Sequence, residues 1–252
     1  MLVIPLCSGA GGYLGRKIAE VFVEAEATLV LCDISNSILA PTEQYCRERG
    51  RKVISLAGDL TDATYVNHIP EETLQTFGRM DVLINNAGIP ANGTIETTTM
   101  EKFDAVMNIN LKATIHLTKL CIPHLSETKG CIINVSSLKA CRSFPNALPY
   151  SVAKAGVDHF TRCLAVEVGH LGIRANSVNP SVIGETLINR HKLDENEKVE
   201  FLKRAKSTHP LGRTATGMDV AHAIAFLASD SASFITGVSL AVDGGRHACC
   251  PT

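Results

Sequence analysis

The chain has 252 residues, of which 45% are apolar and 19% are charged, and its formal net charge is −1. This length and composition suit one globular domain, and a chain without a basic excess is not expected to bind nucleic acid or an anionic membrane. No apolar run approaches the roughly 18 residues of a membrane-spanning helix, and no secretion signal is visible, so we expect a cytoplasmic protein.

Nine cysteines are present, an odd number without a C-x-x-C pair, which predicts neither a disulfide framework nor a metal site. We expect most of them to be small buried apolar residues. The final residues 249–252 have the outline of a prenylation signal, but Pro251 occupies a position where an aliphatic residue is required, so no lipid anchor is expected.

Short β-branched or apolar runs alternate along the chain with longer segments of helical apolar spacing. This alternation predicts repeated βαβ units, and so a single doubly wound Rossmann-type α/β domain over residues 1–252, with a parallel sheet of about seven strands and helices on both faces. Pro5 is awkward in a central strand because proline donates no hydrogen bond. The expected strands are Leu2–Cys7, Ala27–Cys32, Lys52–Ala57, Met80–Ile84, Cys131–Val135, Ile173–Val178 and Val238–Val242, and helical spacing is found in Leu14–Phe22, Met100–Leu125, Ala153–Val168 and Asp219–Ala228.

A glycine-rich loop, residues 8–15 with the sequence SGAGGYLG, follows the first expected strand. Its backbone amides and the positive end of the next helix can approach a pyrophosphate, although a glycine cluster can also be only a turn. The position between a strand and a helix favours phosphate binding. We predict cofactor contacts from Gly9, Gly12, Tyr13 and Leu14.

Two acidic residues end the second and third expected strands. Asp33 can accept hydrogen bonds from the adenosine ribose and repel a 2′-phosphate, which favours NAD over NADP; the alternative role is a helix or turn cap after the strand. Asp59 is expected to cap the next helix, to contact the adenine, or both, with Leu60 beside it.

The second half carries ordered motifs: Asn85–Gly88 (NNAG), Asn108–Leu111 (NINL), Asn134–Ser137 (NVSS) and a Tyr-Ser-Val-Ala-Lys sequence from Tyr150 to Lys154. They continue with Asn179-Pro180, Phe234–Gly237 and Val242–Gly245. With these motifs the chain resembles the single-domain branch of the short-chain dehydrogenase/reductase family. The resemblance covers nearly the whole chain.

The resemblance implies an oxidoreductase that interconverts a secondary alcohol and a ketone by hydride transfer, in the manner of 3-oxoacyl and carbonyl reductases. It implies Tyr150 as acid and base, Lys154 beside it and on the nicotinamide ribose, Ser137 on the substrate oxygen, and Asn110 holding a proton-relaying water. A polar residue that satisfies helix backbone is the alternative for Asn110. The further implied cofactor contacts are Asn86, Ala87, Gly88, Tyr150, Lys154, Pro180 and Ile183.

Acid–base chemistry near neutral pH requires help for a tyrosine, whose pKa is ordinarily about 10. Lys154 follows Tyr150 by four residues and therefore shares its helical face, where an ammonium group favours the phenolate. Tyr13 and Lys17 have the same spacing, but only Tyr150 follows Ser137 at the expected distance and opens an apolar helix.

The sequence departs from the family pattern at several positions. Tyr13 stands where T-G-x-x-x-G-x-G requires glycine, so the loop fits T-G-x-x-G-x-x-G instead, which puts tight cofactor binding in question. Ser181 replaces the glycine of the family's Pro-Gly, and Thr186 lies one position later than its threonine. Lys139 and Arg142 are interpreted as solvated charges, with recognition of an acidic or phosphorylated substrate as the alternative.

Two other functions are compatible with the sequence: a sugar or polyol dehydrogenase, and a non-catalytic dinucleotide-binding sensor or scaffold. The complete Asn, Ser, Tyr and Lys set argues against the latter. We also expect a polar substrate lid over residues 184–212, with a helix near Glu195–Lys206. Apolar surface on the long helices predicts a homo-oligomer, a dimer or a homotetramer.

Overall fold

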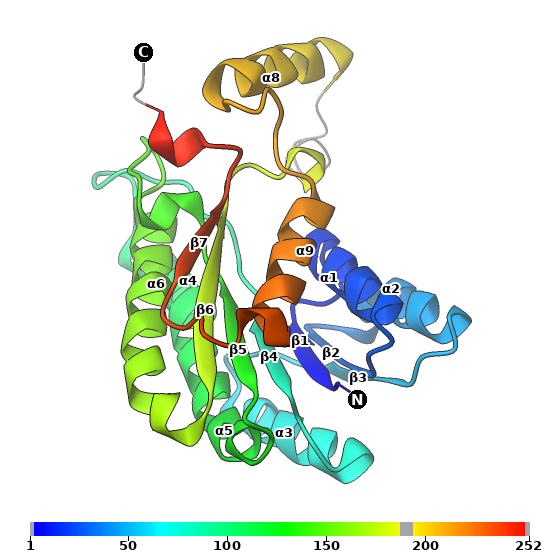
Figure 1. The fold of residues 1–252 in the computed structure, drawn as a ribbon. Helices are drawn as coiled ribbons and strands as arrows, with labels where there is room; N and C mark the ends of the chain where they lie inside the picture. The colour runs from blue at the N-terminus through cyan, green and yellow to red at the C-terminus, as the bar shows by residue number, and fades with distance from the viewer. Residues whose placement is uncertain (1–2, 187–193, 250–252) are drawn as a thin grey trace.

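The computed structural model describes residues 3–186 and 194–249 (Figure 1). Seven parallel strands form one sheet in the order β3-β2-β1-β4-β5-β6-β7, which confirms the doubly wound fold. The strands are β1 (Pro5–Ser8), β2 (Leu29–Asp33), β3 (Val53–Ala57), β4 (Val82–Asn85), β5 (Cys131–Val135), β6 (Arg174–Pro180) and β7 (Ser239–Val242).

Helices cover both faces of the sheet (Figure 1). One face carries α1 (Tyr13–Glu24), α2 (Asn36–Glu48) and α9 (Gly217–Ala228), and the other carries α3 (Ala63–Phe77), α5 (Ala113–Thr128) and α6 (Leu148–Val168), with α4 (Met100–Met107) packed on α6. Side chains alternate between the layers as strand geometry requires. In β2, Leu29 and Leu31 join the core under α1, whereas Val30 and Cys32 join the core on the opposite face.

Pro5 lies in β1, a central strand between β2 and β4. It is tolerated because it is the first residue of the strand, where no ladder donor is needed. The preceding Ile4 N–H donates instead to the Asp81 carboxylate at 2.9 Å, so the backbone hydrogen bonding of the strand start is completed by a side chain.

Three helical features differ from the sequence prediction. Helices α2 and α3, which contain Pro41 and Pro70, were not predicted, although each buries residues at helical spacing. The single helix expected over 100–125 is three segments, because a π-helical turn at Asn108–Lys112 separates α4 from α5.

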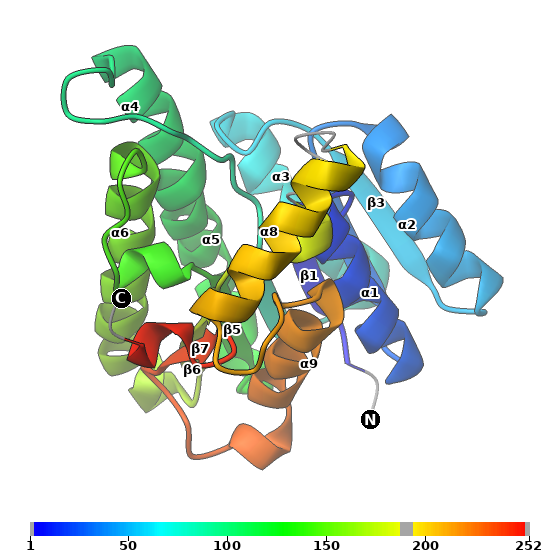
Figure 2. The same cartoon turned by 90° about the horizontal axis from the view of Figure 1, so that it is seen from above.

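Above the carboxyl edge of the sheet lies α8 (Glu195–Thr208), as Figure 2 shows from that side. The helix expected near Glu195–Lys206 is therefore confirmed, and a capping box of Asp194 and Glu197 begins it. Only Ala205 of this helix is buried. Residues 187–193, which the expected lid also includes, lie outside the described residues. Within the described ranges no helix combines the length and apolar content needed to span a membrane.

Candidate active site

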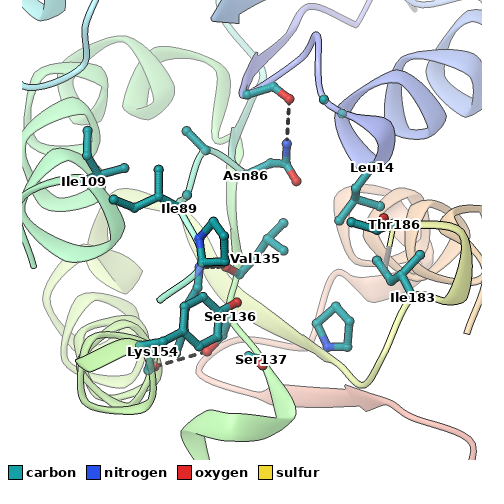
Figure 3. Close-up of a pocket in the computed structure, with 18 of the residues that line it drawn as sticks. Leu14, Asn86, Ile89, Ile109, Val135, Ser136, Ser137, Lys154, Ile183 and Thr186 are labelled. Atoms are coloured by element: carbon teal, nitrogen blue, oxygen red, sulfur yellow. Dashed lines mark hydrogen bonds between the residues drawn. The ribbon is translucent and has the colours of Figure 1, made fainter. Parts of the chain in front are cut away.

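A cleft of about 940 Å³ opens at the carboxyl ends of the strands (Figure 3). The glycine loop and the 180–186 segment form one side, and the loop after β4 and the start of α6 form the other. All the predicted cofactor residues line it: Gly9, Gly12, Tyr13, Leu14, Asp33, Asp59, Leu60, Asn86, Ala87, Gly88, Tyr150, Lys154, Pro180 and Ile183.

The glycine loop is held by close backbone contacts. Gly9 has a φ of +65°, and a Cβ on Gly15 would lie 2.1 Å from the Gly9 carbonyl oxygen, so both positions require glycine. The Asn86 Nδ2 donates to the carbonyls of Ser8 and Gly9 at 3.0 Å each, which ties the loop to the end of β4. The loop therefore presents backbone amides rather than side chains to a ligand.

Tyr13 fits the loop because the facing helix begins with glycine. A Cβ on Gly217 would lie 2.8 Å from Tyr13 Cε1, so the ring occupies space that any larger residue at the start of α9 would fill. Burial and the neighbouring Glu185 carboxylate raise the pKa of the Tyr13 phenol. The missing family glycine is thus compensated on another helix.

The Asp33 carboxylate is fixed at the rim of the cleft, where it accepts from the Gly11 N–H at 2.9 Å and from the Ile34 N–H at 2.7 Å. Asp59 also lines the cleft, and its carboxylate closes a turn by accepting from Thr61. The cap of α3 is Asp62, not Asp59, so of the roles expected for Asp59 only the one in the cleft remains.

Tyr150 and Lys154 lie one turn apart at the start of α6, facing the cleft. The Lys154 Nζ lies 5.8 Å from the centre of the Tyr150 ring and donates to the Val135 carbonyl at 2.7 Å. Burial lowers the pKa of Lys154 to about 8, and the Asp158 carboxylate limits that fall. The structure thus places an ammonium group, desolvated and oriented, beside the phenol.

A buried polar network supports these residues. Asp158, one further turn along α6, accepts from Ser177 at 3.1 Å and from Asn179 at 2.7 Å, and the Asn179 Nδ2 also donates to the Ser137 carbonyl at 3.1 Å. Ser137 in turn accepts from the Lys139 N–H, which begins a short helical turn. Sequence reasoning missed Asp158, although an acid four residues after Lys154 on a buried face was a usable signal.

Asn110 lies beneath the cleft rather than in its wall. Its side chain is fully buried, with Oδ1 accepting from the Ile89 N–H at 2.8 Å and Nδ2 donating to the Ile89 carbonyl at 2.9 Å. A Cβ on Gly88 would lie 3.2 Å from Asn110 Oδ1 and 3.6 Å from Lys154 Nζ, so both groups lie directly behind Gly88. The amide satisfies the backbone of the loop after β4, not helix backbone as the alternative interpretation expected.

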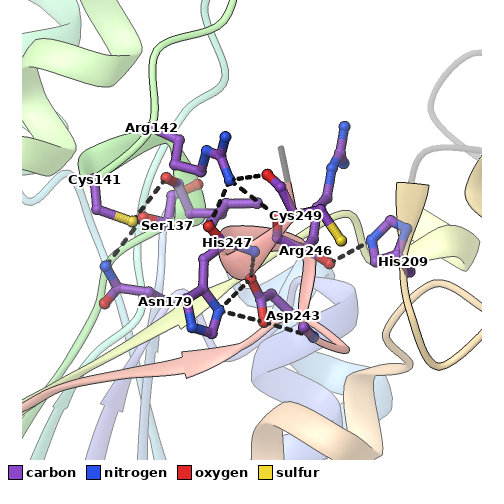
Figure 4. A network of polar contacts seen from close by, with 12 residues as sticks. Ser137, Cys141, Arg142, Asn179, His209, Asp243, Arg246, His247 and Cys249 are labelled. Atoms are coloured by element: carbon purple, nitrogen blue, oxygen red, sulfur yellow. Dashed lines mark hydrogen bonds and ion pairs between the residues drawn. The ribbon is translucent and has the colours of Figure 1, made fainter. Parts of the chain in front are cut away.

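The cations near Tyr150 are arranged differently from the sequence interpretation. Lys139 is half-buried and lines the cleft, so it is not a freely solvated charge. The Arg142 guanidinium donates to the carbonyls of Arg246, His247 and Cys249 and so holds the C-terminal turn (Figure 4). Arg246, which sequence reasoning did not select, lines the cleft.

The 180–186 segment contains two buried side-chain oxygens, Glu185 Oε2 and Thr186 Oγ1, that have no hydrogen-bond partner among the described residues. Thr186 and Ile183 point into the cleft (Figure 3). Ser181 is anchored at 2.9 Å to the Nε2 of His209, a buried residue just after α8. Together with the glycine loop and Asp33, the open Thr186 hydroxyl fits an elongated ligand such as a dinucleotide.

The sheet order and the cleft at the carboxyl ends of the strands define a Rossmann-type α/β domain. The family profile described as Enoyl-(Acyl carrier protein) reductase matches residues 9–247. The chain is 34% identical over 241 residues to 3-oxoacyl-acyl-carrier-protein reductase FabG of Thermotoga maritima, covering 95% of this chain and 96% of that protein. It is 33% identical over 245 residues to meso-2,3-butanediol dehydrogenase of Serratia marcescens, covering 97% and 94%. Carveol dehydrogenase from Mycobacterium avium in complex with NAD has a TM-score of 0.89 at 26% identity, with 97% of both chains covered.

The chain therefore belongs to the short-chain dehydrogenase/reductase family. As a member it is an NAD(P)(H)-dependent oxidoreductase that interconverts alcohols and ketones. The family pattern is altered at Tyr13, which packs against Gly217, and at Ser181, which contacts His209, whereas nothing in the structure explains the displaced position of Thr186.

Proposed function

We propose that the protein is an NAD-dependent dehydrogenase or reductase in which Tyr150 transfers the proton. The observation that carries the proposal is the Lys154 ammonium, desolvated and 5.8 Å from the centre of the Tyr150 ring in the wall of the cleft. The bound nicotinamide would supply or accept the hydride. Glycine-loop amides would hold its pyrophosphate, Asp33 its adenosine ribose, and Thr186 its carboxamide.

In the reductive direction, Ser137 and Tyr150 hydrogen-bond the carbonyl oxygen of the substrate and hold it against the cofactor side of the cleft. The Tyr150 hydroxyl donates its proton to that oxygen as negative charge develops on it. Lys154 stabilises the resulting phenolate and orients the cofactor ribose. Asn110, behind Gly88 next to Lys154, would position the water that returns the proton from solvent. Oxidation follows the same steps in reverse.

The charges along the cleft support NAD over NADP. Asp33 and Asp59 lie at the glycine-loop end, whereas the cations that line the described part of the cleft, Lys139, Lys154 and Arg246, lie at the catalytic end. A 2′-phosphate would meet a carboxylate with no lining cation to neutralise it. We expect NAD to bind at least about tenfold more tightly than NADP, about 1.4 kcal/mol, and equal affinities in a fluorescence titration would contradict this.

We further propose that the protein is a cytoplasmic homo-oligomer with a substrate lid. Exposed apolar residues on α5 and α6, Ile115, Val152 and Val166, support pairing of these helices in a homodimer or homotetramer, which light scattering would test.

The thin packing of α8 over the cleft supports a lid within 184–212, and unchanged hydrogen exchange of α8 with NAD and substrate would contradict it. The exposed free thiols Cys141 and Cys163 fit a reducing, cytoplasmic compartment.

The decisive assay screens ketones, 3-oxoacyl thioesters, sugars and polyols with NAD(H) and NADP(H), following the absorbance of the reduced nicotinamide. Reduction of a ketone or thioester supports the carbonyl-reductase form, whereas oxidation confined to sugars or polyols supports the alternative. NAD binding without turnover of any compound would favour the non-catalytic sensor.

A further inference from the structure

Two cations line the catalytic end of the cleft without an acidic partner. Lys139 lies in the short turn after Ser137, with its Nζ 5.7 Å from the centre of the Tyr150 ring, and Arg246 enters from the turn after β7. Both are half-buried and line the same cleft. No carboxylate lies within 4.0 Å of either charged group in the described part of the chain.

The nearest acid is occupied elsewhere. Asp243 is buried, and its carboxylate accepts from the backbone of Gly245 and from both the backbone and the ring of His247. It therefore closes its own turn (Figure 4) and forms no ion pair with Arg246, although its charge favours the guanidinium from a distance. Two cations thus line the cleft near a single carboxylate that is already hydrogen-bonded.

The position of Arg246 is built into the fold. Arg142 binds three carbonyls of residues 246–249, and this clasp fixes the turn from which the Arg246 side chain extends, with the guanidinium 5.1 Å from the centre of the Phe144 ring. The backbone of Lys139 is also fixed, because its N–H donates to the Ser137 hydroxyl oxygen. The backbones of both cationic residues are thus held by side chains of the segment between β5 and α6, Ser137 and Arg142.

Holding two like charges in a partly dry cleft is unfavourable unless an anion joins them. Burial and Arg246 both lower the pKa of Lys139, and burial is the main cause that lowers the pKa of Arg246. A solvated surface pair would not experience this burial. The arrangement resembles a prepared anion site, in which a lysine and an arginine supply charge-assisted hydrogen bonds.

We propose that Lys139 and Arg246 form a carboxylate subsite, so that the substrate is an oxo acid or hydroxy acid whose carboxylate lies beside the reacting carbon. The proposal rests on the function proposed above, since it places the carbonyl at Ser137 and Tyr150. The two cations line the same cleft as Ser137 and Tyr150, so one small molecule can contact the cations and the reacting side chains together.

The test compares oxo acids of graded chain length with their methyl esters, which keep the ketone and lose the charge. We expect at least one acid to be preferred over its ester by about tenfold or more in kcat/KM. Lys139→Gln and Arg246→Gln should each raise the KM of the acid about tenfold with a smaller change in kcat, and leave the ester nearly unaffected. Lys139→Arg should restore most of the affinity, and Lys52→Gln, an exposed lysine at the opposite edge of the sheet, is the matched control.

The failures are distinguishable. If esters and neutral ketones turn over as well as the acids, the subsite is refuted and the proposed function stands. An equal loss of kcat for acid and ester in Lys139→Gln would also refute it, because Lys139 would then act through Tyr150. If nothing turns over, calorimetry with the same acids and NAD decides: tenfold weaker binding in the variants supports the subsite while the proposed function fails, and unchanged or absent binding refutes the subsite.

Discussion

The nucleotide half and the catalytic half of the sheet prepare their sites in different ways. Around β1 to β3 the cleft is built on the backbone of the loop from Gly9 to Gly15. The main-chain atoms of this loop pack so closely that a side chain at Gly9 or Gly15 would collide with them or their neighbours. Around β4 to β6 the cleft is supported by buried side chains that do not line it, since the Asn85 amide donates to Asn134 at 2.8 Å and the Asn134 amide donates to Thr161 of α6 at 2.8 Å. The nucleotide half requires positions without side chains, whereas the catalytic half requires buried polar side chains that are correctly hydrogen-bonded.

Tyr150→Phe should break the catalytic half alone. It removes the proton-transferring hydroxyl and little else, so turnover should fall at least about 100-fold while NAD affinity stays within a few-fold. Tyr45→Phe on α2 is the matched control, and steady-state rates with a fluorescence titration of NAD provide the measurement. Turnover that survives the substitution would refute the assigned role.

Lys154→Met tests the cost of the buried ammonium. Because folding lowers this pKa from 10.5 to about 8, the unfolded chain binds the proton more tightly, and wild-type stability should rise relative to the variant as pH increases through this window. The difference in unfolding free energy between the two proteins should change by about 2 kcal/mol between about pH 7 and about pH 9.5. Urea unfolding at both pH values measures it, and a constant difference would mean that Lys154 is not desolvated in solution.

Gly9→Ala tests the nucleotide half. The substitution forces a side chain into the left-handed region and places a Cβ 2.9 Å from the Ala87 Cα, so NAD affinity should fall about tenfold, or 1.4 kcal/mol. Gly50→Ala carries the same backbone strain, at a φ of +71°, in open space away from the cleft. Both variants should lose stability, but only Gly9→Ala should lose cofactor affinity, and equal titration curves would contradict a backbone-built site.

The two designs also explain what the sequence made predictable. Strands with dense β-branched runs and a glycine loop leave a local signal, and so do Tyr150 and Lys154, which share one helix. Helices α2 and α3 also bury residues at helical spacing, but each contains a proline, Pro41 or Pro70, and an internal proline argues against a helix when only the sequence is known. Arg246 could not be selected, since it reaches the cleft only through the clasp of Arg142, about a hundred residues earlier in the chain.

The fit of Tyr13 against Gly217 links two positions that no motif connects. The loop lacks a glycine at position 13, but Gly217 at the start of α9 leaves room for the Tyr13 ring, so α1 and α9 can still pack together. Changes at these positions should therefore be inherited together. A side chain at position 217 would meet both Tyr13 and Lys17, so we expect substitutions at 217 to be accompanied by changes at 13 and 17.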